Sequence, residues 1–342
     1  MFSNDLGIDL GTANTVIYVK GKGIVLDEPS VVAIDMNSNE VLAVGEDAQG
    51  MIGRTPGHII AMRPLKDGVI ADYEATRIML KYFINKVKSK ARIVTRPRVL
   101  ICVPTGVTDV EKRAVLEATQ TSGAGVGYVY LIEESMAAAI GAGLPIERAT
   151  GSMVVDIGGG TSEVAVLSLA GIVTSRSLDM AGEELDEAVI TYVKREHGVA
   201  IGERTAEELK KSIGCICNTD FKEEREIRGR DVITGLPRNF TINMGEAAQA
   251  IAEPVSAIVD AVKFTLEKTP PELSADIIEY GIVLTGGGAL LKGLDELVVK
   301  ETGISVKIAD NPLYCVVNGT GMVLQHLKHL KNVLTTSKTL KV

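Results

Sequence analysis

Two short glycine-rich segments repeat one pattern in the two halves of the chain. Residues 9–15 read DLGTANT and residues 156–162 read DIGGGTS. Each segment follows an apolar run that predicts a strand and precedes a second such run. This duplicated unit of strand, Asp, Gly-rich turn and strand predicts two similar lobes that face each other. A third Gly-rich turn, at 285–288, lies between a predicted strand and a predicted helix.

The Gly-rich turns have the composition of phosphate-binding loops. A tight turn rich in Gly, Thr and Ser points successive backbone N–H groups into one concavity that accepts phosphate oxygens. Gly11 leaves room for close approach, and Thr12 and Asn14 can add donors. One Asp-x-Gly turn alone is as typical of an ordinary hairpin. Two such turns together with the third indicate a nucleotide.

The acidic residue before each of the first two turns indicates a cation. Asp9 and Asp156 end strands beside the expected phosphate loops, where a carboxylate and a phosphate would repel each other. Mg²⁺ keeps several of its waters and takes one or two carboxylates. The two aspartates therefore predict a magnesium ion, held through water, that neutralises the polyphosphate.

The third turn and one charged helix are candidates for binding the adenosine. The turn at Gly286–Gly288 leads through Ala289 into a predicted helix, whose N-terminus suits a phosphate or a flat adenine equally well. A turn that only serves packing is the alternative. The predicted helix at 205–213 either lines the ribose and base or presents a solvated face. Its charged residues are Glu207, Glu208, Lys210 and Lys211.

Hydrolysis of the nucleotide requires a group that orients a water in line with the γ-phosphate. The candidates are Glu134, at a strand–helix junction between the two lobes, and Thr161 in the second turn. We expect the adjacent Glu133 to point elsewhere. A Glu at the start of a helix is also typical of simple compensation of the helix dipole. The residues alone therefore leave both interpretations of Glu134 open.

Apolar periodicity predicts an α/β protein in which hairpins lead into strand–helix crossovers. A capping box of Thr108 and Glu111 opens one helix that ends near Gly123, and Pro270 and Pro271 end another. Further helices are predicted at 74–90, 134–142, 183–196, 205–213, 246–268 and 291–301. Strands are predicted at 7–10, 16–19, 98–103, 128–132, 152–157, 163–168, 172–178 and 279–284.

Composition argues against several other classes of protein. The net charge is −8 and the chain has no Trp, so neither the basic face nor the stacking platforms of a general nucleic-acid binder are expected. The four cysteines form no CxxC pair and the four histidines show no metal-binding spacing. No apolar stretch approaches the roughly 18 residues of a membrane span, and the N-terminus has no signal-peptide pattern. We therefore expect a cytoplasmic protein with reduced thiols.

One cationic segment interrupts this acidic chain. Residues 86–98 contain six basic residues and no acidic one, with Ile93 and Val94 in their midst. The pattern favours contact of Ile93 and Val94 with an anionic membrane surface. Each basic residue contributes about 1 kcal/mol there, so a monomer binds weakly and a polymer with many such loops binds by avidity. A solvated loop whose two aliphatic side chains pack inward is the alternative.

Taken together, the motifs resemble the MreB/Mbl family of bacterial actins, within the superfamily of actin, Hsp70 and sugar kinases. The resemblance covers essentially the whole chain. It rests on GIDLGTANT (7–15), LIEESMAAAIGAGL (131–144), VVDIGGGTSEVAV (154–166), GERTAEELK (202–210), IRGRDVITGLP (227–237), PPELSADI (270–277) and LTGGGALLKGL (284–294).

The resemblance implies an actin-like ATPase fold, with two RNase H-like lobes that each carry a smaller inserted subdomain. Its four subdomains are expected at 1–33 with 72–145 and part of 313–342 (IA), at 34–71 (IB), at 146–182 with 246–312 (IIA), and at 183–245 (IIB).

The resemblance also implies ATP or ADP with Mg²⁺ in the cleft between the lobes. By position, the first phosphate loop is matched by Thr12, Ala13 and Asn14, and the second by Gly158, Gly159 and Gly160. The segments around the adenosine are matched by Ala206, Glu207, Glu208 and Leu209, and by Gly286, Gly287, Gly288 and Ala289. Glu134 and Thr161 match the residues that place the hydrolytic water. Ser135 departs from the family, which usually has Pro there, so a fixed φ is missing beside Glu134.

In function, the resemblance implies a slow ATPase coupled to the assembly of membrane-associated filaments, which maintain rod shape by organising cell-wall synthesis. The implied partners are further copies in antiparallel double protofilaments, the anionic inner face of the cell membrane, and elongation proteins such as RodZ, MreC and MreD. Two alternatives come from the same superfamily. A small-molecule kinase needs a sugar pocket on insertions, for which the chain has little spare length, and an Hsp70-like chaperone needs a substrate domain after residue 325.

Overall fold

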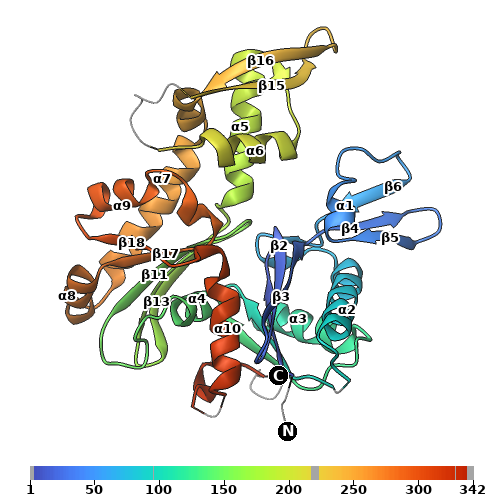
Figure 1. The fold of residues 1–342 in the computed structure, drawn as a ribbon. Coiled ribbons are helices and arrows are strands. Elements are labelled where there is room, and N and C mark those ends of the chain that lie inside the picture. The colour runs from blue at the N-terminus through green and yellow to red at the C-terminus, as the bar shows by residue number, and fades with distance from the viewer. Residues whose placement is uncertain (1–3, 95, 217–222, 328, 337–342) are drawn as a thin grey trace.

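The computed structural model describes residues 4–94, 96–216, 223–327 and 329–336. The chain forms two halves that lie side by side, each built on a five-stranded sheet (Figure 1). Smaller sheets extend from one end of each half.

The two large sheets have the same strand pattern. In each, an antiparallel meander of three strands is extended by two parallel strands that add to its first strand. This pattern confirms the two similar lobes predicted from the repeated Gly-rich segments. The first sheet contains, in spatial order, β3 (Gly23–Pro29), β2 (Asn14–Val19), β1 (Leu6–Leu10), β9 (Val99–Val103) and β10 (Val129–Glu133). The second contains β13 (Gly171–Leu178), β12 (Ser162–Ser168), β11 (Ser152–Ile157), β17 (Ile282–Thr285) and β18 (Val306–Ile308).

Each lobe carries an insertion with a small three-stranded sheet. In the first lobe it comprises β4 (Val32–Asp35), β5 (Glu40–Val44) and β6 (Ile59–Met62) with the short α1 (Glu46–Gln49). A hairpin of β7 (Leu65–Lys66) and β8 (Val69–Ile70) follows. In the second lobe the insertion comprises α5 (Gly182–His197), β14 (Val199–Ala200), α6 (Glu203–Ile213), β15 (Glu224–Asp231) and β16 (Pro237–Asn243). The expected subdomain boundaries stay a prediction.

Three of the longer helices begin at side-chain caps that the sequence encodes. In α2 (Tyr73–Lys90), the Asp72 carboxylate accepts the N–H of Ala75. The capping box of Thr108 and Glu111 opens α3 (Asp109–Thr121), as predicted, and Asn243 caps α7 (Met244–Lys268) in the same way. These caps satisfy N–H groups that have no partner within the helix.

Two predicted elements near the C-terminus are wrong in extent. The strand expected at 279–284 begins only at Ile282, because α8 (Pro271–Tyr280) occupies the preceding residues and ends at Gly281, whose φ is +84°. Pro271 at the first helical position favours this helix start. The helix expected at 291–301 is α9 (Leu294–Thr302), which follows a 3₁₀ turn, η1 (Gly287–Leu290).

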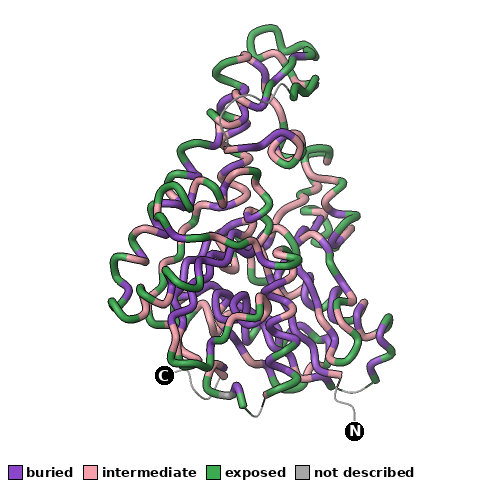
Figure 2. The backbone as a smooth tube through the Cα atoms, turned by 60° about the vertical axis from the view of Figure 1, so that its left-hand side comes forward, coloured by how far each residue is buried: buried purple, intermediate pink, exposed green. Residues whose placement is uncertain are grey.

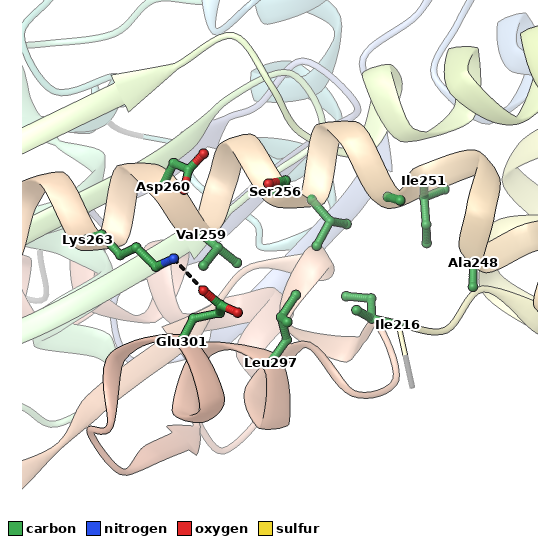
Figure 3. A pocket seen from close by; sticks show the side chains of 11 residues that line it. Ile216, Ala248, Ile251, Ser256, Val259, Asp260, Lys263, Leu297 and Glu301 are labelled. Atoms are coloured by element: carbon green, nitrogen blue, oxygen red, sulfur yellow. Dashed lines mark hydrogen bonds and ion pairs between the residues drawn. The ribbon is translucent and has the colours of Figure 1, made fainter. Parts of the chain in front are cut away.

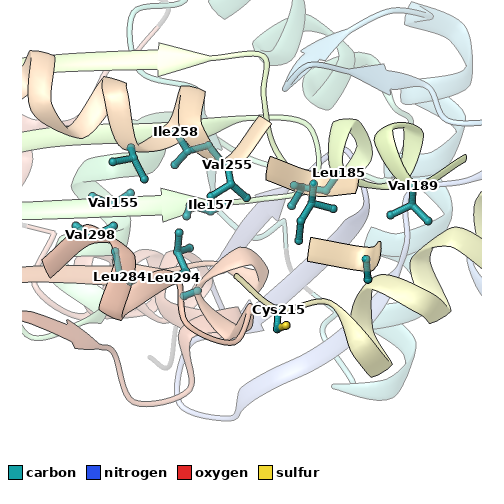
Figure 4. Close-up of a cluster of buried hydrophobic side chains, with 14 of the residues drawn as sticks. Val155, Ile157, Leu185, Val189, Cys215, Val255, Ile258, Leu284, Leu294 and Val298 are labelled. Atoms are coloured by element: carbon teal, nitrogen blue, oxygen red, sulfur yellow. The ribbon is translucent and has the colours of Figure 1, made fainter. Parts of the chain in front are cut away.

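The three largest buried clusters hold the fold together, and buried residues concentrate where the halves join (Figure 2). Figure 4 shows the cluster of the second lobe, in which side chains of β11, α5, α7 and α9 interlock. The cluster of the first lobe packs α2 and α3 against the sheet. The third cluster contains residues from both lobes, from α4 (Glu134–Gly141) and from α10 (Cys315–Gln325).

Helices α4 and α10 cross with their backbones in contact. A Cβ on Gly141 would lie 1.8 Å from the carbonyl oxygen of Cys315, and one on Gly319 would lie 1.9 Å from that of Ala137. Only glycine permits such an approach. The crossing therefore fixes the distance between the two helices at the junction of the lobes.

The cationic segment after α2 has one buried and one exposed aliphatic residue. Ile93 is 5% exposed and packs in the first lobe's core, whereas Val94 is 96% exposed. The expected membrane contact of Ile93 is therefore wrong, because its side chain is buried in the protein core and cannot reach a membrane surface. Val94 keeps the position that a membrane contact requires.

Two further expectations concern thiols and membrane spans. Cys102, Cys215 and Cys315 are buried, and Cys217 lies outside the described residues. Within the described ranges, none of the helices combines the length and the apolar character needed to cross a bilayer.

Candidate functional site

The two repeated Gly-rich turns meet where the lobes face each other. A Cβ on Gly159 would lie 2.6 Å from the Cβ of Ala13, and one on Gly160 would lie 2.6 Å from the Thr12 hydroxyl oxygen. Contacts this short force a shift of the neighbouring atoms. The missing side chains of Gly159 and Gly160 therefore allow the turns to approach each other, as the repeat predicted.

Both turns are closed by the same backbone bond. The N–H of Gly11 donates to the Asn14 carbonyl at 3.1 Å, and that of Gly158 donates to the Thr161 carbonyl at 2.9 Å. Both turns are therefore tight, as a phosphate-binding concavity of backbone N–H groups requires. We expected the Asn14 side chain to add a donor to the concavity. Its amide instead donates to the Asp27 carboxylate at 2.9 Å.

Four carboxylates from both lobes gather beneath the turns: Asp9, Glu134, Asp156 and Glu163. Burial raises the pKa of Asp9 to about 8, and the charges of Asp156 and Asp27 add to this effect. Burial raises the pKa of Asp156 to about 6, although the Thr285 hydroxyl, which donates to Asp156 at 2.6 Å, works against the rise. Both pKa rises express mainly the cost of burying a charge away from water, and for Asp9 also the cost of placing it near other carboxylates.

The proposed water-placing residues lie at this cluster. Glu134 is the first residue of α4 and is 8% exposed, and Thr161 is 7% exposed. Burial and then the charges of Glu163, Asp9 and Asp156 raise the pKa of Glu134 well above its ordinary value. Glu133 points elsewhere, as expected, and pairs with Lys112 at 3.6 Å.

The start of α5 places further charged groups beside the cluster. Arg63 reaches across from the first lobe: its Nη1 donates to the Ala13 carbonyl at 3.3 Å and its Nε lies 3.3 Å from Glu183 Oε1. Lys210 donates to the Gly182 carbonyl at 2.6 Å and pairs with Asp186 at 2.9 Å.

Two buried side-chain oxygens at this position lack a hydrogen-bond donor among the described residues, namely Glu183 Oε1 and Asp186 Oδ1. Glu183 Oε1 forms an ion pair with Arg63 Nε, but the two groups are not oriented for a hydrogen bond. A buried acceptor without a donor is costly. Hydroxyl groups of a bound sugar are donors of the kind that these oxygens require.

Some charged residues of α6 face the site, and others lie on a solvated helix face. Lys210 faces α5 as described, and Glu207 is partly covered and pairs with Lys211 at 2.7 Å. Glu208 is exposed and pairs with Arg204 at 3.0 Å, as the solvated-face interpretation expects. Ala206 and Leu209 have their side chains in the core of the second lobe, so only their backbone remains for a ligand.

The third Gly-rich turn packs directly on the second. A Cβ on Gly286 would lie 2.3 Å from the Ile157 carbonyl oxygen, and one on Gly288 would lie 2.1 Å from the Ile157 Cγ2. Both glycines thus serve packing, which was the alternative interpretation. Gly287 between them is exposed. The Ala289 side chain is buried in the core.

The residues that sequence reasoning missed are Arg63, Glu163, Glu183 and Asp186. Glu183 and Asp186 are three residues apart at the start of a predicted helix, a spacing that places them on one helix face. Glu163 interrupts an otherwise apolar buried strand. In the described residues, no group of three or more His, Cys, Asp or Glu side chains is arranged to hold a metal by itself.

A separate groove of about 290 Å³ lies between α7 and α9 on the second lobe (Figure 3). Its walls are aliphatic, including Ile251, Val255 and Leu297, and the ion pair of Lys263 with Glu301 lies across one end. It contains none of the residues of the Gly-rich turns.

Comparison with known proteins places these features in one family. The family model described as MreB/Mbl protein matches residues 3–332. The chain is 55% identical over 330 residues to the cell shape-determining protein Mbl of Bacillus subtilis, covering 96% of this chain and 98% of that protein. It is 57% identical over 329 residues to the cell shape-determining protein MreB of Escherichia coli, covering 95% and 94% respectively.

Solved structures agree with the fold. The crystal structure of MreB5 of Spiroplasma citri bound to ADP superimposes with a TM-score of 0.89 at 38% identity, covering 96% of this chain and 97% of that one. A second structure, of the same protein bound to AMPPNP, gives the same values. The MamK double helical filament has a TM-score of 0.77 at 22% identity, covering 94% and 98%, and supports the fold alone. The actin-like fold expected from the sequence is confirmed.

Proposed function

The chain belongs to the MreB/Mbl family of actin-like, cell shape-determining proteins, and from this we propose that it binds and slowly hydrolyses ATP and assembles into filaments. One observation carries the proposal: two Gly-rich turns from separate lobes meet above a buried cluster of carboxylates. A triphosphate between the turns would join the lobes, and its hydrolysis would loosen them. Binding of ADP and AMPPNP by the Spiroplasma citri relative supports this.

The carboxylates fit a hydrated Mg²⁺ ion. Asp9 and Asp156 come from opposite lobes. Burial raises the pKa of both, and the charge of Asp156 further raises that of Asp9. A divalent cation between them would stabilise both carboxylates in their charged form. Two carboxylates and no closed protein cage are what Mg²⁺ takes when phosphate and water supply its other ligands. We propose that Asp9 and Asp156 hold Mg²⁺ through water, which would neutralise the phosphate charge.

For hydrolysis, we propose that Glu134 and Thr161 place the attacking water from the two sides of the cleft. Phosphoryl transfer depends mainly on positioning and charge stabilisation, and both side chains are held in the buried region below the turns. Glu183 Oε1 and Asp186 Oδ1, which lack a hydrogen-bond donor among the described residues, would accept hydrogen bonds from the ribose hydroxyls. Lys210 would hold the Asp186 carboxylate in place.

The test is calorimetric titration of the full chain with ATP, with Mg²⁺ and with a chelator, followed by electron microscopy. We expect saturable binding with Mg²⁺, weaker binding with the chelator, and filaments with Mg²⁺ and ATP. A folded protein that takes up no ATP would refute the proposal. Turnover that depends on a sugar would favour the kinase alternative, and turnover stimulated by peptides without sedimentable polymer would favour the chaperone.

We extend the proposal to a location in the cytoplasm at the inner face of the membrane, where polymers would organise the cell-wall elongation machinery. Val94 is 96% exposed within a run of basic residues, which supports contact with anionic lipid.

Replacement of Val94 by Ser should reduce binding of polymers to anionic vesicles at least several-fold. An apolar side chain contributes at most roughly 1.5–3 kcal/mol per buried copy, and the loss recurs in every copy of a filament. Co-sedimentation with vesicles measures this. Val94→Leu is the matched control and should bind like the wild type. Equal binding of the Ser and Leu variants, at equal polymer mass, would contradict a role for Val94.

A further inference from the structure

The carboxylate of Glu163 is held entirely by groups of the opposite lobe. Glu163 lies on β12 of the second lobe and is 1% exposed. Thr105 donates its N–H to Oε1 at 2.5 Å and its hydroxyl to Oε2 at 2.6 Å. Ser135 donates its N–H to Oε2 at 3.0 Å. Thr105 follows β9 and Ser135 is the second residue of α4, so both donors belong to the first lobe.

The two donor residues also bind each other. The hydroxyls of Thr105 and Ser135 lie 2.7 Å apart, and both residues are buried. Since each hydroxyl can donate once and the Thr105 hydroxyl serves Glu163, the Ser135 hydroxyl donates to Thr105. The three residues form one closed network across the cleft, which we term the interlobe network.

The interlobe network adjoins both groups that would place the water. Ser135 directly follows Glu134 in the first turn of α4, and Glu163 lies two residues after Thr161. Because the carboxylate accepts an N–H of this turn, it fixes the turn relative to β12. The distance between Glu134 and Thr161 is then set by bonds of the network and not only by packing of the lobes.

The network is strong enough for this task. Three hydrogen bonds converge on one buried carboxyl group. Burial raises the pKa of Glu163 to about 7, and the bonds from Thr105 and Ser135 work against that rise. The bonds therefore favour the charged carboxylate, to which hydrogen bonds are roughly twice as strong as neutral ones. Opening the lobes would leave that carboxylate without its partners, which is costly unless water replaces them. The network therefore resists separation of the lobes as well as rotation of α4.

We propose that Glu163 is an interlobe positioning residue, which, through Thr105 and Ser135, holds Glu134 opposite Thr161 and slows release of bound nucleotide. The proposal rests on the proposed nucleotide binding for both effects and on the proposed hydrolysis for the effect on rate. It also gives Ser135 a role that a proline could not fill, because proline has no N–H to donate.

The test uses the full chain with three substitutions: Glu163→Gln, Thr105→Val and the conservative Thr105→Ser. Gln presents an amide N–H to one of the donors and breaks at least one bond. Val has the shape of Thr without its hydroxyl, whereas Ser keeps the hydroxyl. We measure single-turnover hydrolysis of Mg²⁺-ATP, ATP affinity, and release of a fluorescent ADP analogue, after checking the fold by thermal melting.

The expected result is a fall of about tenfold in the single-turnover rate for Glu163→Gln and Thr105→Val, with ATP affinity changed less than the rate, and a several-fold faster ADP release. Thr105→Ser should restore both. A merely structural role would lower the melting temperature and not separate rate from affinity. Equal values for the Val and Ser variants in both measurements would overturn the proposal. If the wild type does not hydrolyse ATP, the proposed hydrolysis is refuted. The rate of ADP release still tests whether the interlobe network slows nucleotide release.

Discussion

Replacement of Glu134 by Ala is expected to lower the rate of ATP hydrolysis by about 100-fold or more, with ATP binding largely retained. Positioned proton-accepting groups contribute typically 10²–10⁴-fold to a reaction. Glu134 is buried at the start of α4, among three other carboxylates. Removal of the Glu134 carboxylate also relieves charge repulsion in the cluster, so the substitution should not destabilise the fold through this cluster. A loss of rate would then not come from unfolding. Single-turnover hydrolysis and calorimetric ATP affinity are the two measurements.

The matched control for this experiment is the neighbouring glutamate. Glu133 pairs with Lys112 on the other side of the backbone, so Glu133→Ala should hydrolyse ATP at close to the wild-type rate. If both alanine variants lose activity equally, the effect belongs to the start of α4 and not to the Glu134 carboxylate.

Replacement of Gly160 by Ala is expected to weaken Mg²⁺-ATP binding by about 10- to 100-fold. The new Cβ would lie 2.6 Å from the Thr12 hydroxyl oxygen and 3.0 Å from the Thr12 Cβ, so the two turns must separate. Overpacking costs typically 1–3 kcal/mol, and each 1.4 kcal/mol is a factor of ten in affinity. Calorimetric titration with Mg²⁺-ATP measures the loss.

Gly171→Ala provides the control for the Gly160 variant. Gly171 begins β13, and its nearest neighbour would be 3.6 Å from the added Cβ, an ordinary contact. This variant should bind ATP like the wild type. Unchanged affinity in both glycine variants would show that the turns do not close on the nucleotide.

Local patterns in the sequence predicted most of the large elements. The repeated turns predicted the duplicated lobes, and the caps at Thr108 and before α2 lie where the sequence places suitable side chains. The strand expected at 279–284 was placed three residues too early, because Glu279 and Tyr280 belong to the last turn of α8 and Gly281 ends that helix. The small sheets of the insertions, such as β15 with β16, were not predicted. Their exposed strands alternate weakly, so periodicity carries little signal.

The site was only partly predictable for a different reason. Asp9, Asp156 and the glycines stand in recognisable local motifs, whereas the bonds of Glu163 join residues up to 58 positions apart. Such a partnership depends on how two lobes dock. The outward position of Val94 and the inward position of Ile93 also depend on tertiary packing, since a loop has no period that separates one from the other.

The glycine crossing of α4 and α10 limits how the molecule can respond to its ligand. With backbones in direct contact at Gly141 and Gly319, the helices cannot slide apart without losing close-packed atoms on both sides. The remaining motion is a rotation of one helix relative to the other about their crossing point. A small displacement at the phosphates would then grow with distance along each lobe, so the outermost insertions would move furthest.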